Sequence, residues 1–271
     1  MNLRTLKDEV DALQIAFDKK DRPWYLDGAT IISVLALIFS FGTTWVSNRK
    51  ADAQDIENQR IELRGLLQRM AELPKANLEA MDKYRTNPSA LNTVAGYINQ
   101  ENTFLAGQAA EIARQLPPGK VSAVEYYAIA VALGNAYNIE DEKKFLALSI
   151  QNANDFNTEI AAIRTNATIL FPTGHPEAGR AEYQKALAIF DKYTNFDDYT
   201  KKYTHIKTEL SWACSEFLAR TGTQFFEQHL KNAEGLVAEL LPSPGREQLE
   251  AEIRQVRQQL QAPYPVSPTG K

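Results

Sequence analysis

Residues 176–190 read PEAGRAEYQKALAIF, and this stretch decides the fold class. Gly179, Tyr183, Ala186 and Leu187 recur at steps of four, three and one, which places them on one face of a helix. Small residues on either side of an aromatic ring allow a second helix to approach closely. The stretch therefore predicts the second helix of a tightly packed helical hairpin.

A related pattern lies one hairpin earlier, in EYYAIAVALGNAY at residues 125–137. Leu133, Gly134 and Tyr137 supply the small and aromatic residues there, and Ala153 supplies a second small contact in the helix that follows. Ala153 and Ala186 lie 33 residues apart. The two units resemble tetratricopeptide repeats (TPRs), helical hairpins that recur about every 34 residues and stack into a solenoid.

The resemblance is partial. Ala130 stands where the family has tryptophan in the first unit, and Ala167 stands where it has glycine in the second. The turn of the second unit contains the unusual sequence PTGHP. About 65 residues carry support at the level of the motif.

Residues 75–261 keep helical periodicity throughout, without an alternating strand pattern. A third hairpin is expected from Tyr199 to Leu241, and residues 88–116 suggest an earlier one. Proline and glycine mark the breaks between helices at Asn87-Pro88, Pro117 to Gly119, Pro172 to Pro176, Gly222 and Pro242 to Gly245. We predict an all-α chain in which residues 75–261 form a TPR-like α-solenoid.

Both ends of the chain have their own patterns. Residues 1–22 place Leu3, Leu6, Val10, Leu13 and Phe17 on one face and predict an amphipathic helix. The helix expected over residues 247–260 has one apolar face and predicts a cap on the last repeat. Residues 262–271 are proline-rich and predict a flexible tail.

The sequence ATIISVLALIFSFGTTWV at residues 29–46 carries no charge over 18 positions, about 27 Å of helix. This length predicts a single transmembrane helix through the lipid bilayer. Trp24, Tyr25 and Trp45 are expected at the membrane interfaces, and Arg49 and Lys50 end the insertion. A single uncleaved segment after a short charged tail favours a domain outside the cytoplasm, in the periplasm if the source is bacterial.

Residues 47–73 are expected to continue the anchor as a helical stalk that ends at Pro74. A heptad-like seam contains Ile56, Leu63, Leu66, Met70 and Leu73, with Gln59 in one apolar slot. Two explanations stay open: a coiled coil between copies, which would make the protein a homo-oligomer, or packing of the stalk on the chain's own domain.

Composition and motifs limit the classes of function that we expect. The net charge of −4 and the scattered Lys and Arg residues give no basic field, so nucleic acid is not an expected partner. The chain shows no phosphate loop, zinc-ligand spacing or nucleophile elbow, so we expect no cofactor, no metal and no catalytic residue. Cys214, the only cysteine, reads as a buried helix position.

In a solenoid of this kind the first helices of the hairpins line a concave groove. Val131, Asn135 and Asn138 of the first unit are expected to face this groove, and Arg164 and Thr168 of the second unit take comparable places. The resemblance implies that Asn and Arg at such positions bind an extended peptide or its terminal carboxylate, and a guanidinium can bind a carboxylate with two hydrogen bonds.

Together these features predict a membrane-anchored protein–protein interaction scaffold or accessory factor whose partners are other proteins or peptides. Two alternatives stay open. One is a self-associating structural membrane protein, in which the helical domain is a spacer. The other is a membrane-tethered enzyme with an unfamiliar site.

Overall fold

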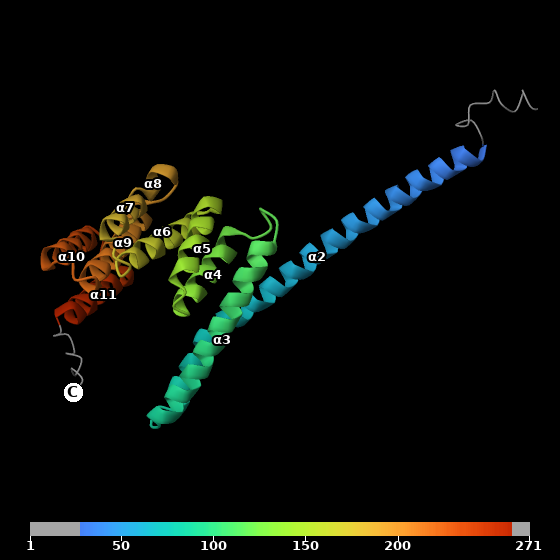
Figure 1. The fold of residues 1–271 in the computed structure, drawn as a ribbon. Helices are drawn as coiled ribbons and strands as arrows, with labels where there is room; N and C mark the ends of the chain where they lie inside the picture. The colour runs from blue at the N-terminus through green and yellow to red at the C-terminus, as the bar shows by residue number, and fades with distance from the viewer. Residues whose placement is uncertain (1–27, 262–271) are drawn as a thin grey trace, which may run out of the picture. The chain divides into compact units, whose positions relative to one another are not determined.

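The computed structural model describes the backbone of residues 28–261 and the side chains of residues 53–258 (Figure 1). The regular elements in this part of the chain are all helices, which confirms the all-α class. In chain order they are α2 (Gly28–Lys83), α3 (Pro88–Gln115), α4 (Ala123–Asn135), α5 (Ile139–Asn152), α6 (Phe156–Leu170), α7 (Pro176–Leu187), α8 (Ile189–Lys192), α9 (Asp198–Leu218), α10 (Thr223–Ala238) and α11 (Pro244–Gln261).

The chain divides into two compact units, residues 1–59 and residues 60–271. In the first unit the structure describes the helical backbone from Gly28 onward. The second unit contains the end of α2 and all later helices. The predictions for residues 1–22 and 262–271, and for Trp24 and Tyr25, lie outside the described residues.

The prediction of a transmembrane helix, with the membrane localisation that rested on it, is contradicted. No helix within the described residues combines the length and the apolar character needed to span a bilayer. Residues 29–46 belong to α2, which continues without a break into charged sequence and ends only at Lys83. Trp45, Arg49 and Lys50 lie on the same helix, and their side chains are outside the described set.

The end of α2 packs against α3 within the second unit. Leu63, Met70 and Leu73 are buried, and Arg69 Nε donates a hydrogen bond of 2.6 Å to Glu101 of α3. These residues of the heptad-like seam therefore pack on the chain's own domain, which removes the main argument for a coiled coil between copies.

Two predicted boundaries near this hairpin are wrong. The stalk does not end at Pro74, because α2 passes through this proline to Lys83. Burial of Leu73 and Ala80 on either side stabilises the helix there despite the hydrogen bond that proline removes. Residues 88–116 do not form a hairpin either, since α3 is one continuous helix that buries Ala106, with other small residues, near its C-terminal end.

Helices α4 and α5 form the first predicted hairpin. Ser122 and Glu125 make a capping box that starts α4. Gly134 allows a close approach of α5, but the group that it meets is the carboxylate of Glu142: a Cβ at Gly134 would lie 2.4 Å from Glu142 Oε1. Ala153, expected to be the small contact, is instead the C-cap of α5. Tyr137, expected inside the hairpin, is 90% exposed.

Helices α6 and α7 form the second hairpin, and its small residues lie where the pattern predicts. A Cβ at Gly179 would lie 2.5 Å from the ring of Phe171 and 3.1 Å from the carbonyl oxygen of Ala167. Ala167, Tyr183 and Ala186 are completely buried. Glycine at this position therefore sets how closely α7 approaches α6.

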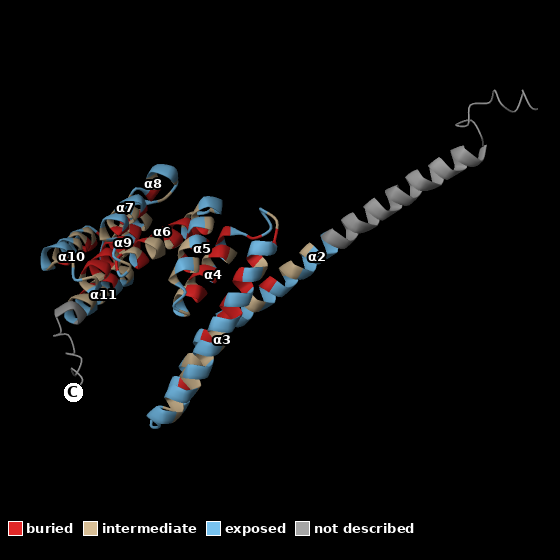
Figure 2. Cartoon of the chain, viewed as in Figure 1, coloured by how far each residue is buried: buried red, intermediate tan, exposed pale blue. Residues whose placement is uncertain are grey.

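Helices α9 and α10 form the third hairpin, and α11 packs on both (Figure 2). Ala213 and Ala233, the small residues noted in the sequence, are buried in one hydrophobic cluster together with Leu249 and Ile253 of α11. The helix expected over residues 247–260 thus covers the apolar side of the last hairpin. Apart from Pro74, each predicted proline or glycine break coincides with the start or end of a helix.

Candidate functional site

Arg164, on α6, is a basic side chain of the second unit with a buried atom that lacks a hydrogen-bond partner. Its Nε atom is buried without a hydrogen-bond partner, and no carboxylate of the described residues pairs with its guanidinium. Burial lowers its pKa, and the hydroxyl groups of Tyr127, Tyr183 and Tyr203 partly oppose this effect. A guanidinium keeps its proton in proteins, so the charge persists in a half-buried position. Such a charge attracts an anion.

The tyrosines near Arg164 come from three different helices, α4, α7 and α9. Tyr127 of α4 shares a hydrogen bond of 3.2 Å with Thr165, the residue next to Arg164. Tyr203 of α9 is 42% exposed. The charge of Arg164 is therefore bordered by aromatic side chains on both sides of α6.

One turn after Arg164, Thr168 begins a chain of hydroxyl groups. Thr168 Oγ1 donates to the carbonyl oxygen of Arg164 at 3.0 Å and shares a hydrogen bond of 2.8 Å with the Tyr183 hydroxyl. Tyr183 also shares a hydrogen bond of 2.8 Å with Ser215 of α9. Burial raises the pKa of Tyr183, so its hydroxyl stays protonated. This chain holds α6, α7 and α9 in register.

A cavity of about 250 Å³ lies beside Thr168 and is open to solvent. It is bordered by Thr168 of α6, by Lys207, Leu210, Ser211, Cys214, Ser215 and Leu218 of α9, and by Glu252 and Val256 of α11. We call it the Thr168 cavity. Lys207 Nζ and Glu252 Oε1 form an ion pair of 2.5 Å that joins α9 to α11 at its wall. The cavity therefore combines an aliphatic surface with hydroxyl groups.

Cys214 is half-buried in the wall of this cavity rather than in the core. Burial raises the pKa of its thiol, and the negative charge of Glu252 raises it further. The thiol is therefore protonated at neutral pH and acts here as a small, weakly polar surface.

Comparison of the chain with protein-family models, with curated proteins and with solved structures found no match.

The groove residues expected from the sequence are distributed unevenly. Arg164 and Thr168 lie together at the site described above. Val131 is half-buried and Asn135 is exposed on α4. Asn138 is the N-cap of α5, where its side chain accepts a hydrogen bond from the backbone N–H of Asp141 and donates one to the Asp141 carboxylate. Its amide is thus occupied by a capping role.

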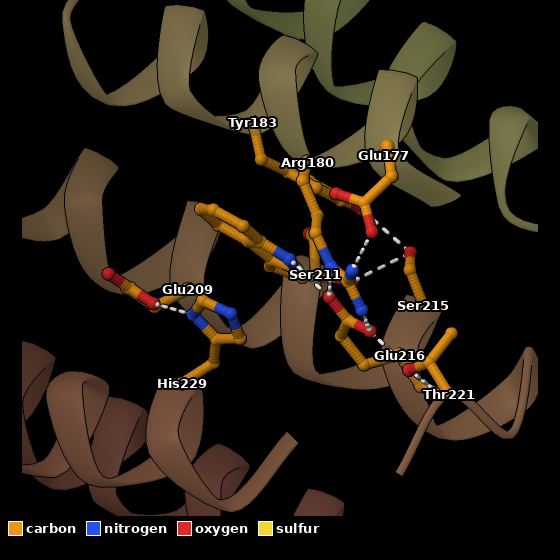
Figure 3. Close-up of polar contacts among 10 residues, drawn as sticks. Glu177, Arg180, Tyr183, Glu209, Ser211, Ser215, Glu216, Thr221 and His229 are labelled. Atoms are coloured by element: carbon orange, nitrogen blue, oxygen red, sulfur yellow. Dashed lines mark hydrogen bonds and ion pairs between the residues drawn. The ribbon is translucent and has the colours of Figure 1, made fainter. Parts of the chain in front are cut away.

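A buried polar network lies on the other side of α9 (Figure 3). Arg180 of α7 donates two hydrogen bonds to Glu216, of 2.7 and 2.8 Å, and Trp212 Nε1 donates a third of 2.9 Å. Burial alone would raise the pKa of Glu216, but the hydrogen bonds from Arg180, Thr221 and Trp212 leave it below its ordinary value. This carboxylate is charged and fully buried at neutral pH.

A second buried pair adjoins the first through Trp212. His229 Nδ1 lies 2.6 Å from Glu209 Oε2, and the ring of His229 stacks on Trp212 with 3.9 Å between centroids (Figure 3). The sequence offered no signal for this network because its main pairs are distant in the chain: Glu209 and His229 lie 20 residues apart, and Arg180 and Glu216 lie 36 apart. No group of three or more His, Cys, Asp or Glu side chains in the described part of the chain is placed to hold a metal ion.

Proposed function

We propose that this protein is a helical-repeat interaction module that holds a segment of another protein against α4, α6 and α9. The observation that carries the proposal is Arg164, a half-buried guanidinium without an acidic partner. A buried charge without a counter-ion costs free energy, and a bound carboxylate would remove that cost.

The repeat architecture in this proposal is supported by the packing of α6 on α7. The glycine at position 179 faces Ala167 and Phe171, as a small residue does at the crossing of two repeat helices. Packing contacts run mainly within each hairpin, and the contacts between hairpins join those that are neighbours in the chain, the arrangement expected of stacked repeats.

The Thr168 cavity supports a peptide as the bound molecule. It is open, contains aliphatic and hydroxyl groups, and is bordered by Thr168, one helical turn after Arg164 on α6. Sites for peptide side chains combine these properties, because an apolar surface supplies affinity and a few polar groups supply orientation.

The proposal is tested by selecting binders from a random peptide library against the immobilised protein. We expect peptides rich in Asp and Glu to be enriched on the wild-type protein and not on an Arg164→Gln variant. Arg164→Lys keeps the charge without the planar fork, so it should retain part of the enrichment. Gln is preferable to Glu at this position because Glu would bury a carboxylate where Nε now lies.

A selection that enriches the same peptides on wild-type and Arg164→Gln protein would contradict the proposal. Circular dichroism and thermal unfolding of both proteins establish that the variant is folded. Leu241→Ser, at an 84% exposed position that does not border the Thr168 cavity, is the matched control and should leave the enrichment unchanged.

A further inference from the structure

Arg164 and Thr168, which borders the Thr168 cavity, lie on successive turns of α6. Arg164 and Thr168 are four residues apart on α6, a rise of about 6 Å along the helix axis. Thr168 belongs to both features, since its hydroxyl bonds to the Arg164 carbonyl and its side chain borders the cavity. A ligand that runs along this part of α6 meets the two features at backbone positions about 6 Å apart.

The first group is anionic. Arg164 has no acidic partner among the described side chains, and its surroundings consist of tyrosine hydroxyl groups rather than carboxylates. The cavity has one carboxylate, Glu252, and Lys207 pairs with it. Arg164 is thus the position where a ligand's negative charge gains most.

The second group is aliphatic. Leu210, Leu218 and Val256 are the aliphatic residues that line the cavity, and Cys214 adds a protonated thiol. Leu218 is 69% exposed although it lies on a helix with a well-packed core face. An aliphatic side chain in the cavity would cover this leucine and release its hydration water.

An extended peptide fits the spacing. Side chains on one face of an extended chain recur every second residue, at about 6.6 to 6.8 Å. We propose that the site selects an extended segment in which an internal Asp or Glu and an aliphatic residue are separated by one residue. The acidic side chain pairs with Arg164, and the aliphatic side chain enters the Thr168 cavity.

This inference rests on the proposed function and makes it specific. We infer an internal acidic residue because α6 contacts two further helices, α4 with Tyr127 and α9 with Tyr203, whose tyrosines both act on the Arg164 charge. A segment that runs past Arg164 in both directions can use both surfaces.

The test uses labelled nine-residue peptides, blocked at both ends, and fluorescence polarisation with the full-length protein. One peptide has Glu-Ser-Leu at its centre and one has the reverse order, Leu-Ser-Glu. Matched peptides carry Gln-Ser-Leu, Glu-Ser-Ala, or Glu and Leu side by side. We expect at least one of the first two to bind, and each matched change to weaken that binding about tenfold.

Protein variants separate the two contacts. Arg164→Gln should abolish the preference for Glu over Gln and keep the preference for Leu over Ala. Leu218→Ser should have the reverse effect, and because this leucine is exposed the variant is expected to fold. Leu241→Ser is the control and should bind as the wild type does.

Three results would overturn the inference. If the peptide with Glu and Leu side by side binds as tightly as the peptide with one residue between them, the proposed spacing of the two side chains is wrong. A Gln-Ser-Leu peptide with an unblocked C-terminus is added for a second comparison, and binding to this peptide alone would show that Arg164 pairs with a terminal carboxylate and not with an internal acid. If none of these peptides binds while the library still yields ligands that depend on Arg164, the motif is wrong and the proposed function stands; ligands indifferent to Arg164 would overturn both.

Discussion

Two buried side-chain atoms of the described residues lack a hydrogen-bond partner, Glu142 Oε2 and Arg164 Nε. The two side chains carry opposite charges and differ in their exposure to solvent. Glu142 is 4% exposed and lies against Gly134, inside the first hairpin. Arg164 is half-buried, one helical turn before Thr168, which borders an open cavity. We therefore expect the first residue to affect stability, and the second is the one that we propose binds a ligand.

Glu142→Gln should stabilise the protein at neutral pH. Burial raises the pKa of Glu142 from 4.5 to about 6, which corresponds to about 2 kcal/mol against the ionised form. Because the folded-state pKa is raised, this residue's contribution is most favourable below pH 4.5 and is lost as the pH rises through about 6. Urea unfolding at pH 7.5 should give about 1 to 2 kcal/mol more stability for the variant.

The pH series provides the control for this prediction. The difference between wild-type and variant proteins should shrink as the pH falls from 7.5 to 4.5, because a protonated Glu142 resembles Gln. If the difference does not change with pH, ionisation of the Glu142 carboxylate is not its cause.

Tyr137→Gly should also stabilise the protein. Tyr137 follows α4 with φ of +60°, and its side chain is 90% exposed. A residue with a Cβ pays about 1 to 2 kcal/mol for this left-handed conformation, which glycine adopts freely. We expect a gain of about 1 kcal/mol by chemical unfolding, whereas Tyr137→Ala keeps the Cβ and should give no comparable gain. If Tyr137→Gly and Tyr137→Ala change the stability equally, the cause is the loss of the aromatic ring and not the backbone conformation.

At the scale of elements, the joint between the second and third hairpins depends on Arg180. This residue of α7 bonds to the fully buried Glu216 of α9 and lies over the ring of Phe225 at 4.3 Å. Arg180→Met would leave the carboxylate buried without its cation, a change that costs about 3 to 5 kcal/mol. Equilibrium unfolding at pH 7 measures this loss.

Two comparisons test whether this loss comes from the buried ion pair. Lys185→Ala removes an exposed ion pair with Glu182 on the same helix, so it should cost about 0.5 kcal/mol or less. The pKa of Glu216 is lowered in the wild type, so the contribution of the pair is present above pH 4.5 and is lost as the pH falls through the lowered value. The Arg180→Met effect should diminish accordingly, and an effect as small as that of Lys185→Ala would contradict the assignment.

At the scale of the whole second unit, stability depends on neighbouring hairpins and on the helix that ends the array. Leu249 and Ile253 of α11 complete the cluster formed by α9 and α10. Repeat arrays need such an end because each hairpin buries its apolar face only against the next element.

Replacing Leu249 and Ile253 together by Ser should therefore lower the Tm strongly and promote association, because apolar surface of α9 and α10 becomes accessible. Differential scanning calorimetry and light scattering measure the two effects. Gln248 and Gln255 are exposed on the same helix, so replacing both by Ser is the matched control and should change neither. Equal behaviour of the two variants would show that α11 does not act as the cap.

Much of the fold follows from local sequence. Helical periodicity and the breaks at proline and glycine determined the helical class, the three hairpins and the apolar face of α11, because turns and amphipathic faces depend on nearby residues. Gly179 and Ala167 were recognisable because small residues at a helix crossing have a fixed spacing. Arg164 and Thr168 were placed by the same periodicity.

Only the tertiary structure decided which groups meet. It placed Glu142 against Gly134, left Arg164 without an acid, and paired Arg180 with Glu216 across 36 residues. It also assigned Asn138 to a cap, brought Cys214 and Leu218 to a cavity, and removed the predicted membrane span. Local pattern cannot determine these features, because the cost of burying a charge depends on the side chains that other helices bring to it.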